Sequence, residues 1–99
     1  MNSMVLKMMG GDMNPQMVDE GIKLLRLSNH LIELGVRAEL RDNNTALMVH
    51  RPDNGLPVWV FVGYGGAYYS WQSAEKRHPV DDAAGAAKVL FDYIKGRAF

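Results

Sequence analysis

The sequence contains no cysteine. This absence excludes disulfides, thiolate nucleophiles, iron–sulfur clusters and cysteine-based zinc sites together. The chain also has no excess charge of either sign, because 11 basic residues balance 11 acidic residues. No strong overall field therefore attracts nucleic acid or an anionic membrane, and any such binding would need a local cluster of charge.

A long hydrophobic run is also missing. The longest unbroken apolar segment is residues 58–62, far shorter than the ~20 residues that cross a bilayer. The N-terminal residues carry one lysine and an apolar stretch too short for a secretory signal, without a cleavage site of the A-x-A kind. We therefore expect a cytoplasmic protein that does not associate with membranes.

The length and composition are those of one small globular domain. Of the 99 residues, 47% are hydrophobic and 22% are charged, which predicts a single domain over residues 1–99 with a thin core. We expect residues 1–13 either to be disordered or to form a short strand that covers part of this domain.

The clearest structural signal is an aromatic hairpin over residues 58–73. Gly65 and Gly66 join two β-prone runs, as in a two-residue type I′ turn, which needs positive φ at both central positions. If Tyr64 lies opposite Ala67, alternation divides the side chains between two faces. One face takes Val58, Val60, Val62, Tyr64, Ala67, Tyr69 and Trp71, and the other takes Trp59, Phe61, Gly63, Tyr68, Ser70 and Gln72.

A helix is predicted over residues 15–34, before this hairpin. Asn14 and Pro15 suit its start and Gly35 suits its end. Its broad apolar stripe is expected to pack on a sheet, and consists of Val18, Ile22, Leu25 and Ile32 with Met17, Leu24 and Leu31 beside them. Gly21 within the helix indicates a close approach to another element.

The remaining pattern predicts a second hairpin and a second helix. Residues 36–41 and 45–51 alternate with a period of two around a tip at Asn43 and Asn44, so that Leu40 faces Leu47. His78 and Pro79 end the sheet, a helix begins at a cap formed by Asp81 or Asp82, and Gly96 ends it. We therefore predict an α+β fold of order α-β-β-β-β-α, a four-stranded antiparallel meander sheet with two helices on one face.

This arrangement leaves the second sheet face without a cover. Trp59, Phe61 and Tyr68 lie on it, flanked by Met48 and His50 from the neighbouring strand. An exposed apolar surface of this kind usually marks an interaction site. The alternative is cover from within the chain, by residues 4–9 or by a C-terminal tail that includes Phe99.

Two other interpretations use the same sheet. Aromatic side chains on a sheet can stack the bases of single-stranded nucleic acid, with Phe61 as a platform and Arg37 and Arg41 as the positive charges. The zero net charge, Glu39 among the arginines and the lack of an RNA-recognition signature argue against nucleic acid. A small ligand could also bind between sheet and helices, against a lining of Tyr64, Tyr69 and Trp71.

No pattern indicates catalysis or metal binding. His30, His50 and His78 lie in separate segments, without the H-x-x-x-H spacing that places two ligands on one helix face. The Gly63–Gly66 loop leads into another strand and not into a helix, unlike a phosphate-binding loop. We expect no catalytic residue, no metal and no cofactor, and so a protein that is not an enzyme.

Part of the C-terminal region resembles a known group of proteins. Tyr69-Ser70-Trp71, His78-Pro79-Val80-Asp81-Asp82 and Ala83-Ala84-Gly85-Ala86-Ala87 resemble the C-terminal half of small uncharacterised proteins from actinobacteria. The resemblance covers about a third of the chain and implies an intracellular bacterial protein. It implies no activity and no site residues.

The sequence as a whole favours a non-catalytic protein that acts through contact with other proteins. We expect self-association as a homodimer, or binding of a protein partner, through the aromatic sheet face. Trp59, Phe61 and Tyr68 would be the anchors, and Met48 would supply adaptable contact.

Overall fold

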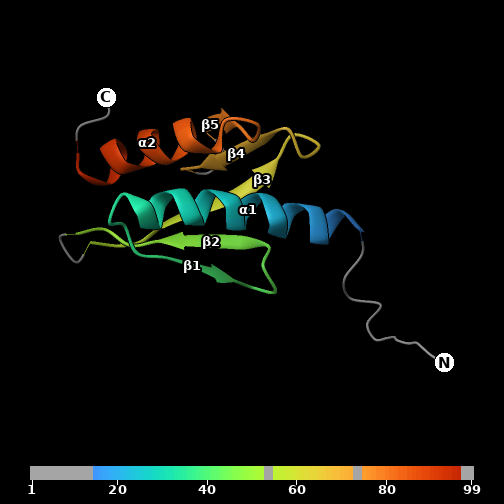
Figure 1. Ribbon diagram of the computed structural model, residues 1–99, viewed down its shortest axis with the longest axis horizontal. Coiled ribbons are helices and arrows are strands. Elements are labelled where there is room, and N and C mark those ends of the chain that lie inside the picture. The colour runs from blue at the N-terminus through green and yellow to red at the C-terminus, as the bar shows by residue number, and fades with distance from the viewer. Residues whose placement is uncertain (1–14, 53–54, 73–74, 97–99) are drawn as a thin grey trace.

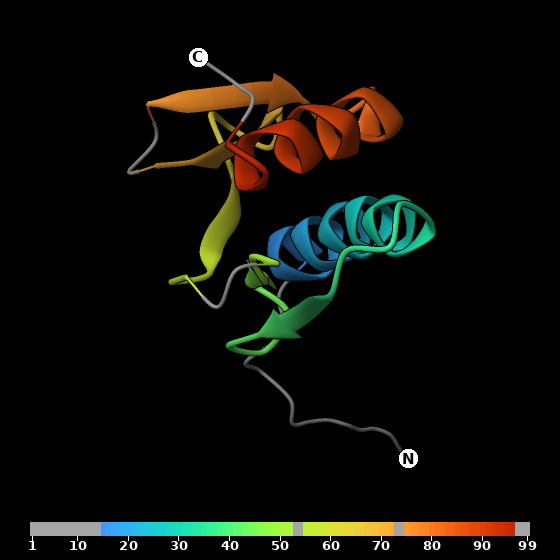
Figure 2. The ribbon, with the colours of Figure 1, turned by 90° about the vertical axis from the view of Figure 1, so that its left-hand side faces the viewer.

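The computed structural model describes residues 15–52, 55–72 and 75–96. In chain order the elements are α1 (Pro15–Glu33), β1 (Ala38–Arg41), β2 (Ala46–Val49), β3 (Val58–Gly63), β4 (Tyr68–Trp71), β5 (Lys76–Pro79) and α2 (Ala83–Ile94). The strands form one antiparallel meander in this order (Figure 1). Both helices lie on the same side of it (Figure 2). The predicted α+β class and antiparallel sheet are confirmed, while the expectations for residues 1–13 and Phe99 concern parts of the chain outside the described residues.

The prediction of four strands is wrong, because residues 76–79 form a fifth strand, β5. This strand pairs with β4 from Trp71 opposite Lys76 to Tyr68 opposite Pro79. Its sequence, Lys-Arg-His-Pro, has none of the apolar alternation by which strands are recognised. Charged residues and proline are nevertheless common on edge strands, where they prevent pairing with other chains. Pro79 is therefore the last residue of an edge strand and not the first residue beyond the sheet.

The central strand β3 joins two hairpins. Its first half pairs with β2, from Val58 opposite Val49 to Val60 opposite Leu47. Its second half pairs with β4, from Phe61 opposite Ser70 to Gly63 opposite Tyr68. The two hairpins consequently extend from different halves of β3, and the sheet turns strongly between them (Figure 2).

The predicted registers are confirmed, but the turns differ from the expected two-residue type. Leu40 lies opposite Leu47, and Val62 lies opposite Tyr69, the strand register that the expected Tyr64–Ala67 pair implies, although residues 64–67 themselves form the turn. Each connection contains three consecutive left-handed residues: Asp42, Asn43 and Asn44 with φ of 55°, 56° and 66°, and Tyr64, Gly65 and Gly66 with φ of 56°, 69° and 90°. Asp, Asn and Gly accept this conformation readily, whereas Tyr64 does not, so the Gly-Gly pair carries only part of the turn.

Only one side of the predicted α1 stripe enters the core. Leu24, Leu27 and Leu31 are completely buried, together with α2 residues such as Leu90 and Ala87. Met17 is partly buried, and the four main members of the stripe remain substantially exposed: Val18 at 42%, Ile22 at 52%, Leu25 at 48% and Ile32 at 55%. The expectation that these four pack on the sheet is wrong, because the apolar arc is wider than the surface that one sheet covers.

Contacts with both hairpin tips fix α1 on the sheet. Lys23 Nζ donates to the carbonyl oxygen of Gly66 at 2.9 Å, and the buried Tyr69 hydroxyl donates to the carbonyl oxygen of Lys23 at 2.7 Å. At the other tip, a Cβ atom added to Gly21 would lie 3.2 Å from Asn44 Cβ. The close approach predicted for Gly21 is thereby confirmed.

The second helix begins at a specific cap. Asp82 is the N-cap residue, and its Oδ1 accepts a hydrogen bond from the Gly85 amide at 3.2 Å. His78 contributes a second contact, with Nε2 2.8 Å from Asp82 Oδ2. These two hydrogen bonds hold the pKa of Asp82 below its ordinary value, with the His78 contact the larger cause.

The left-handed turn predicts a contrast between two glycines. Gly65→Ala should lower the free energy of unfolding by about 1 kcal/mol, because Gly65 has φ of 69° and an alanine there is strained whatever the space around it. Gly63→Ala is the matched control, since its new Cβ would lie at an ordinary 3.7 Å from Ser70 Oγ. Urea denaturation of both variants measures the difference, and equal losses would contradict the turn geometry.

Candidate functional site

Alternation along β3 places Trp59 and Phe61 on the side of the sheet away from both helices. Trp59 is 39% exposed and Phe61 is 47% exposed, whereas Val58 and Val60 on the opposite side are buried. Met48 lies directly across from Trp59 on β2 and is partly buried. Together with Tyr68, these residues form what we call the outer aromatic face: Met48, Trp59, Phe61 and Tyr68.

Arg77 completes this face at its β5 side. Its guanidinium carbon lies 5.0 Å from the centre of the Tyr68 ring and 4.8 Å from the centre of the Tyr64 ring, within the range of cation–π attraction. The two tyrosine rings meet edge to face at 5.6 Å. Sequence reasoning missed Arg77 because it lies on the strand that was not predicted. It also placed Tyr64 toward the helices, whereas the positive φ of Tyr64 brings its ring against Tyr68 on the outer side.

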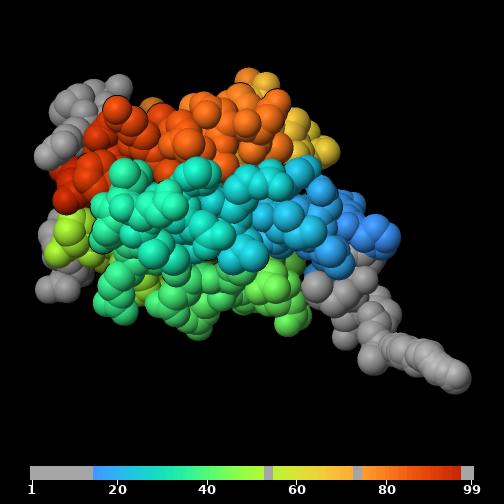
Figure 3. Space-filling view, in the orientation of Figure 1, coloured from blue at the N-terminus to red at the C-terminus, as the bar shows by residue number. Residues whose placement is uncertain are grey.

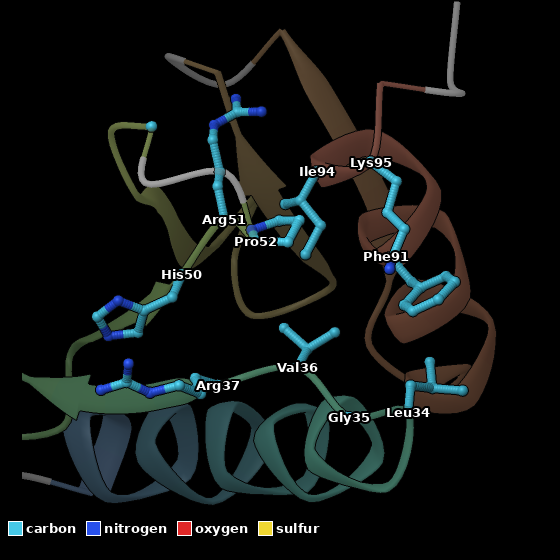
Figure 4. Close-up of a pocket in the computed structure, with 11 residues that line it drawn as sticks. Leu34, Gly35, Val36, Arg37, His50, Arg51, Pro52, Phe91, Ile94 and Lys95 are labelled. Carbon is cyan, nitrogen blue, oxygen red and sulfur yellow. The ribbon is translucent and has the colours of Figure 1, made fainter.

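His50 and the β1 side chains form the opposite border of the face. Glu39 lies between two basic groups, with Oε2 2.7 Å from His50 Nε2 and Oε1 3.7 Å from Arg41 Nη1. The hydrogen bond to His50 is the main reason that the pKa of Glu39 lies below its ordinary value. Arg37 lies beside His50 (Figure 4). The predicted residues Met48, His50, Trp59, Phe61 and Tyr68 are thus all on or beside one face, with Arg37 and Arg41 at its edge.

A groove opens at the end of the molecule where both helices finish. Its volume is about 460 Å³, and its apolar lining includes Val36, Phe91 and Ile94. Four basic residues also line it: Arg37, His50, Arg51 and Lys95. Figure 4 shows that Arg37 and His50 lie together at one side of this groove, while Phe91 and Ile94 of α2, and Lys95 directly after it, lie on the other side.

The basic side chains of this groove are largely engaged with the protein itself. Arg51 Nε donates to the Leu56 carbonyl oxygen at 2.9 Å, and its guanidinium carbon lies 5.5 Å from the centre of the Tyr93 ring. Lys95 Nζ lies 4.8 Å from the centre of the Phe91 ring, and His50 is bonded to Glu39. An anion in the groove would have to compete with these contacts. Basic groups near helix C-termini are also favourable without a ligand.

The residues expected to line a ligand cavity between sheet and helices are located elsewhere. Tyr69 is 0% exposed and Trp71 is 2% exposed, both within the hydrophobic core. Tyr64 lies at the hairpin turn, and none of the three lines the groove of Figure 4. The Trp71 Nε1 atom has no hydrogen-bond partner among the described residues, and its ring meets Tyr93 edge to face at 6.4 Å.

The described residues contain no cluster of three histidine, aspartate or glutamate side chains that could hold a metal ion. The histidines lie apart, each beside a different carboxylate: His30 beside Glu33, His50 beside Glu39 and His78 beside Asp82. Neither α1 nor α2 has the length and apolar character that a membrane crossing requires.

The Glu39–His50 contact predicts how the Glu39 carboxyl titrates with pH. The carboxyl resonance of Glu39 should titrate below the ordinary glutamate pKa, and His50→Ala should move the midpoint upward, as followed by NMR. Because folding lowers this pKa, the associated stabilisation is present above the unfolded-state pKa and is lost as the pH falls through the folded-state value. A midpoint that His50→Ala leaves unchanged would contradict the hydrogen bond.

Comparison of the chain with protein families, with curated proteins and with solved structures found no match. The resemblance to actinobacterial proteins therefore stays a prediction, and inferences about function depend on the geometry of the outer aromatic face and of the helices.

Proposed function

We propose that this protein is a non-catalytic interaction protein that binds another protein through the outer aromatic face. The observation that supports this most strongly is the exposure of two neighbouring aromatic side chains on the central strand, Trp59 at 39% and Phe61 at 47%. Large aromatic residues and methionine are enriched at protein interfaces and supply most of the binding energy there. A surface of this type beside polar residues is the usual signature of an interaction site.

The charges around the face favour a particular kind of partner. Arg37, Arg41 and Arg77 lie on the outer side of the sheet, and Glu39 is the acidic residue among the described β1 to β5 strand residues on that side. A partner that carries carboxylates beside apolar side chains complements this pattern. Two copies packed face to face would instead bring guanidinium groups of the same charge together. We therefore assign this face to a different protein.

The position of Arg77 favours single-stranded nucleic acid as a second candidate. Arg77 lies beside Tyr68 at one edge of the face, and Arg41 lies at the other edge. Their guanidinium groups flank the aromatic side chains. Phosphates could contact such arginines while bases stack on Phe61. The balanced overall charge of 11 basic and 11 acidic residues weakens this candidate.

Peptide selection against the full chain tests the first candidate. Panning a random peptide library should yield ligands with apolar residues beside Asp or Glu. Trp59→Asp and Phe61→Asp should weaken binding of the selected synthetic peptides by about 30-fold, the loss typical of an interface hot spot. Val89→Asp is the matched control, because Val89 is an apolar residue of α2 with 37% exposure. Calorimetry measures the affinities, and circular dichroism checks the fold.

Two outcomes would contradict the protein-binding proposal. Selected peptides that bind the Trp59 and Phe61 variants as tightly as the wild-type chain would assign recognition to another surface. A library that yields no ligand at all would contradict the proposal that this face recognises peptide segments of another protein.

The nucleic-acid candidate has its own test, in fluorescence polarisation with labelled oligothymidine of about 20 nucleotides. Binding should weaken steeply between about 50 mM and 200 mM salt. Arg41→Ala and Phe61→Ala should each reduce the affinity, while Val89→Ala should not. No binding at the lower salt concentration would eliminate this candidate.

A further inference from the structure

The uncovered side of α1 carries a regular apolar row. We call this row the α1 seam: Val18, Ile22, Leu25, Asn29 and Ile32. Its four apolar members are between 42% and 55% exposed, and Asn29 is exposed as well. Figure 3 shows the face of the molecule that α1 crosses, with α2 along one side and the β1–β2 hairpin along the other. No described element lies over α1 on this face.

The spacing of the α1 seam is that of a coiled coil. Its members follow one another at intervals of four, three, four and three residues, which keeps them on one side of a helix along its length. The seam is separate from the side that holds the fold together, because Leu24, Leu27 and Leu31 are the completely buried residues of α1. Packing within the described chain therefore does not account for the apolar character of the seam.

The residue types along the seam favour a coiled coil of two helices. In heptad terms Ile22 and Asn29 occupy a positions, and Val18, Leu25 and Ile32 occupy d positions. A β-branched residue at a with leucine at d, as at Ile22 and Leu25, favours a dimer. A single asparagine at an a position sets the register of a parallel dimer, because its amide can pair with the same amide of an identical helix.

We infer that the α1 seam binds the α1 seam of a second copy of this chain, in a parallel pair about a two-fold axis. In this arrangement Asn29 meets Asn29 of the partner copy. With two fully overlapped antiparallel helices, Asn29 would instead meet the apolar N-terminal half of the seam, where its amide has no partner. A self-complementary pair of this kind is an isologous contact, which closes at two copies.

The borders of the seam agree with a parallel pair. The border nearer the sheet carries Gly21, which lies against Asn44, and Ser28, which is buried, so no charged side chain stands there. The other border carries Asp19, Arg26 and Glu33. Parallel pairing turns each charged border toward the uncharged border of the partner copy, so the charged borders of the two copies do not meet.

The size of the contact indicates a moderate affinity. A helix of 19 residues is about 28 Å long, so a helix pair alone is smaller than the ~800 Å² per partner of standard interfaces. Two shallow hollows border the seam, one beside Val18 and Ile22 and the other beside Ile32, and they extend the surface available for contact. We expect a dissociation constant in the micromolar range.

This inference is independent of the proposed function, because the α1 seam and the outer aromatic face lie on opposite sides of the sheet. A dimer through the helices leaves both outer faces accessible. Self-association and partner binding can therefore occur in the same assembly. An experiment that contradicts one of the two proposals leaves the other intact.

Sedimentation equilibrium of the full chain tests the pairing. At about 100 times a micromolar dissociation constant, the wild-type chain should have twice the monomer mass of 11.1 kDa. Ile22→Glu should have the monomer mass, because a charge would then be placed in the dimer seam. Val89→Glu and Trp59→Asp are the controls on other surfaces and should keep the dimer mass, with circular dichroism to verify folding.

Three results in this experiment would overturn the inference. A monomeric wild-type chain would mean that no second copy binds, whether or not another part of the chain covers the seam. A dimer that persists in Ile22→Glu would locate the contact elsewhere. Dissociation by Trp59→Asp with no effect of Ile22→Glu would assign self-association to the outer aromatic face.

Disulfide cross-linking tests the parallel orientation. The chain has no cysteine, so Ile32→Cys introduces a single thiol near the C-terminal end of the seam. A parallel pair brings the two introduced thiols close enough to form a disulfide on oxidation, and a covalent dimer should appear on a non-reducing gel. Val89→Cys is the control and should stay monomeric on the gel. A noncovalent dimer that Ile32→Cys fails to cross-link would contradict parallel pairing.

Discussion

The alternation of side chains along β3 is the constraint on which the rest of the structure depends. β3 pairs with β2 through its first half and with β4 through its second half, so its register fixes both hairpins. Val58 and Val60 then face the helices and are buried, while Trp59 and Phe61 face away from them. A shift by one residue would exchange the two sets and would place the exposed aromatic residues in the core.

The helices cover only one of the apolar surfaces of the chain. α1 and α2 bury the inner side of the sheet around Tyr69 and Trp71, and Lys23 and Tyr69 tie α1 to the second hairpin. On the outer side of the sheet Trp59 and Phe61 stay exposed, and on the far side of α1 so do Ile22 and Leu25. These two surfaces lie on opposite sides of the molecule, so the proposed contact with a second copy and the proposed contact with a different protein would use separate surfaces.

Local patterns predicted the hairpins better than the limits of the sheet or the facing of the helix. The period of two fixed the pairing of Leu40 with Leu47, and of Val62 with Tyr69, because each hairpin brings together residues that are close in sequence. β5 was not predicted because Lys76 to Pro79 is an edge strand, which is held by its pairing with β4 and not by the burial of apolar side chains. Arg77, and with it the second charged border of the candidate site, was missed for the same reason.

The sequence of α1 does not predict which of its sides is buried. Apolar residues occupy more than one side of this helix, and only the position of the sheet decides that Leu24 and Leu27 are buried while Ile22 and Leu25 are exposed. The candidate residues Trp59 and Phe61 could be placed on the outer face because strand alternation needs no tertiary information.

The most direct test of the account is the solvent exposure of the two tryptophans in the isolated chain. The 99-residue chain labelled with 5-fluorotryptophan has two labelled positions, Trp59 and Trp71, and a Trp59→Phe variant assigns their ¹⁹F resonances. At a concentration below self-association, the Trp59 resonance should shift between H₂O and D₂O, since Trp59 is 39% exposed, whereas the resonance of Trp71, which is 2% exposed, should not. Protection of both resonances would mean that the chain covers its own outer face, and would contradict the account.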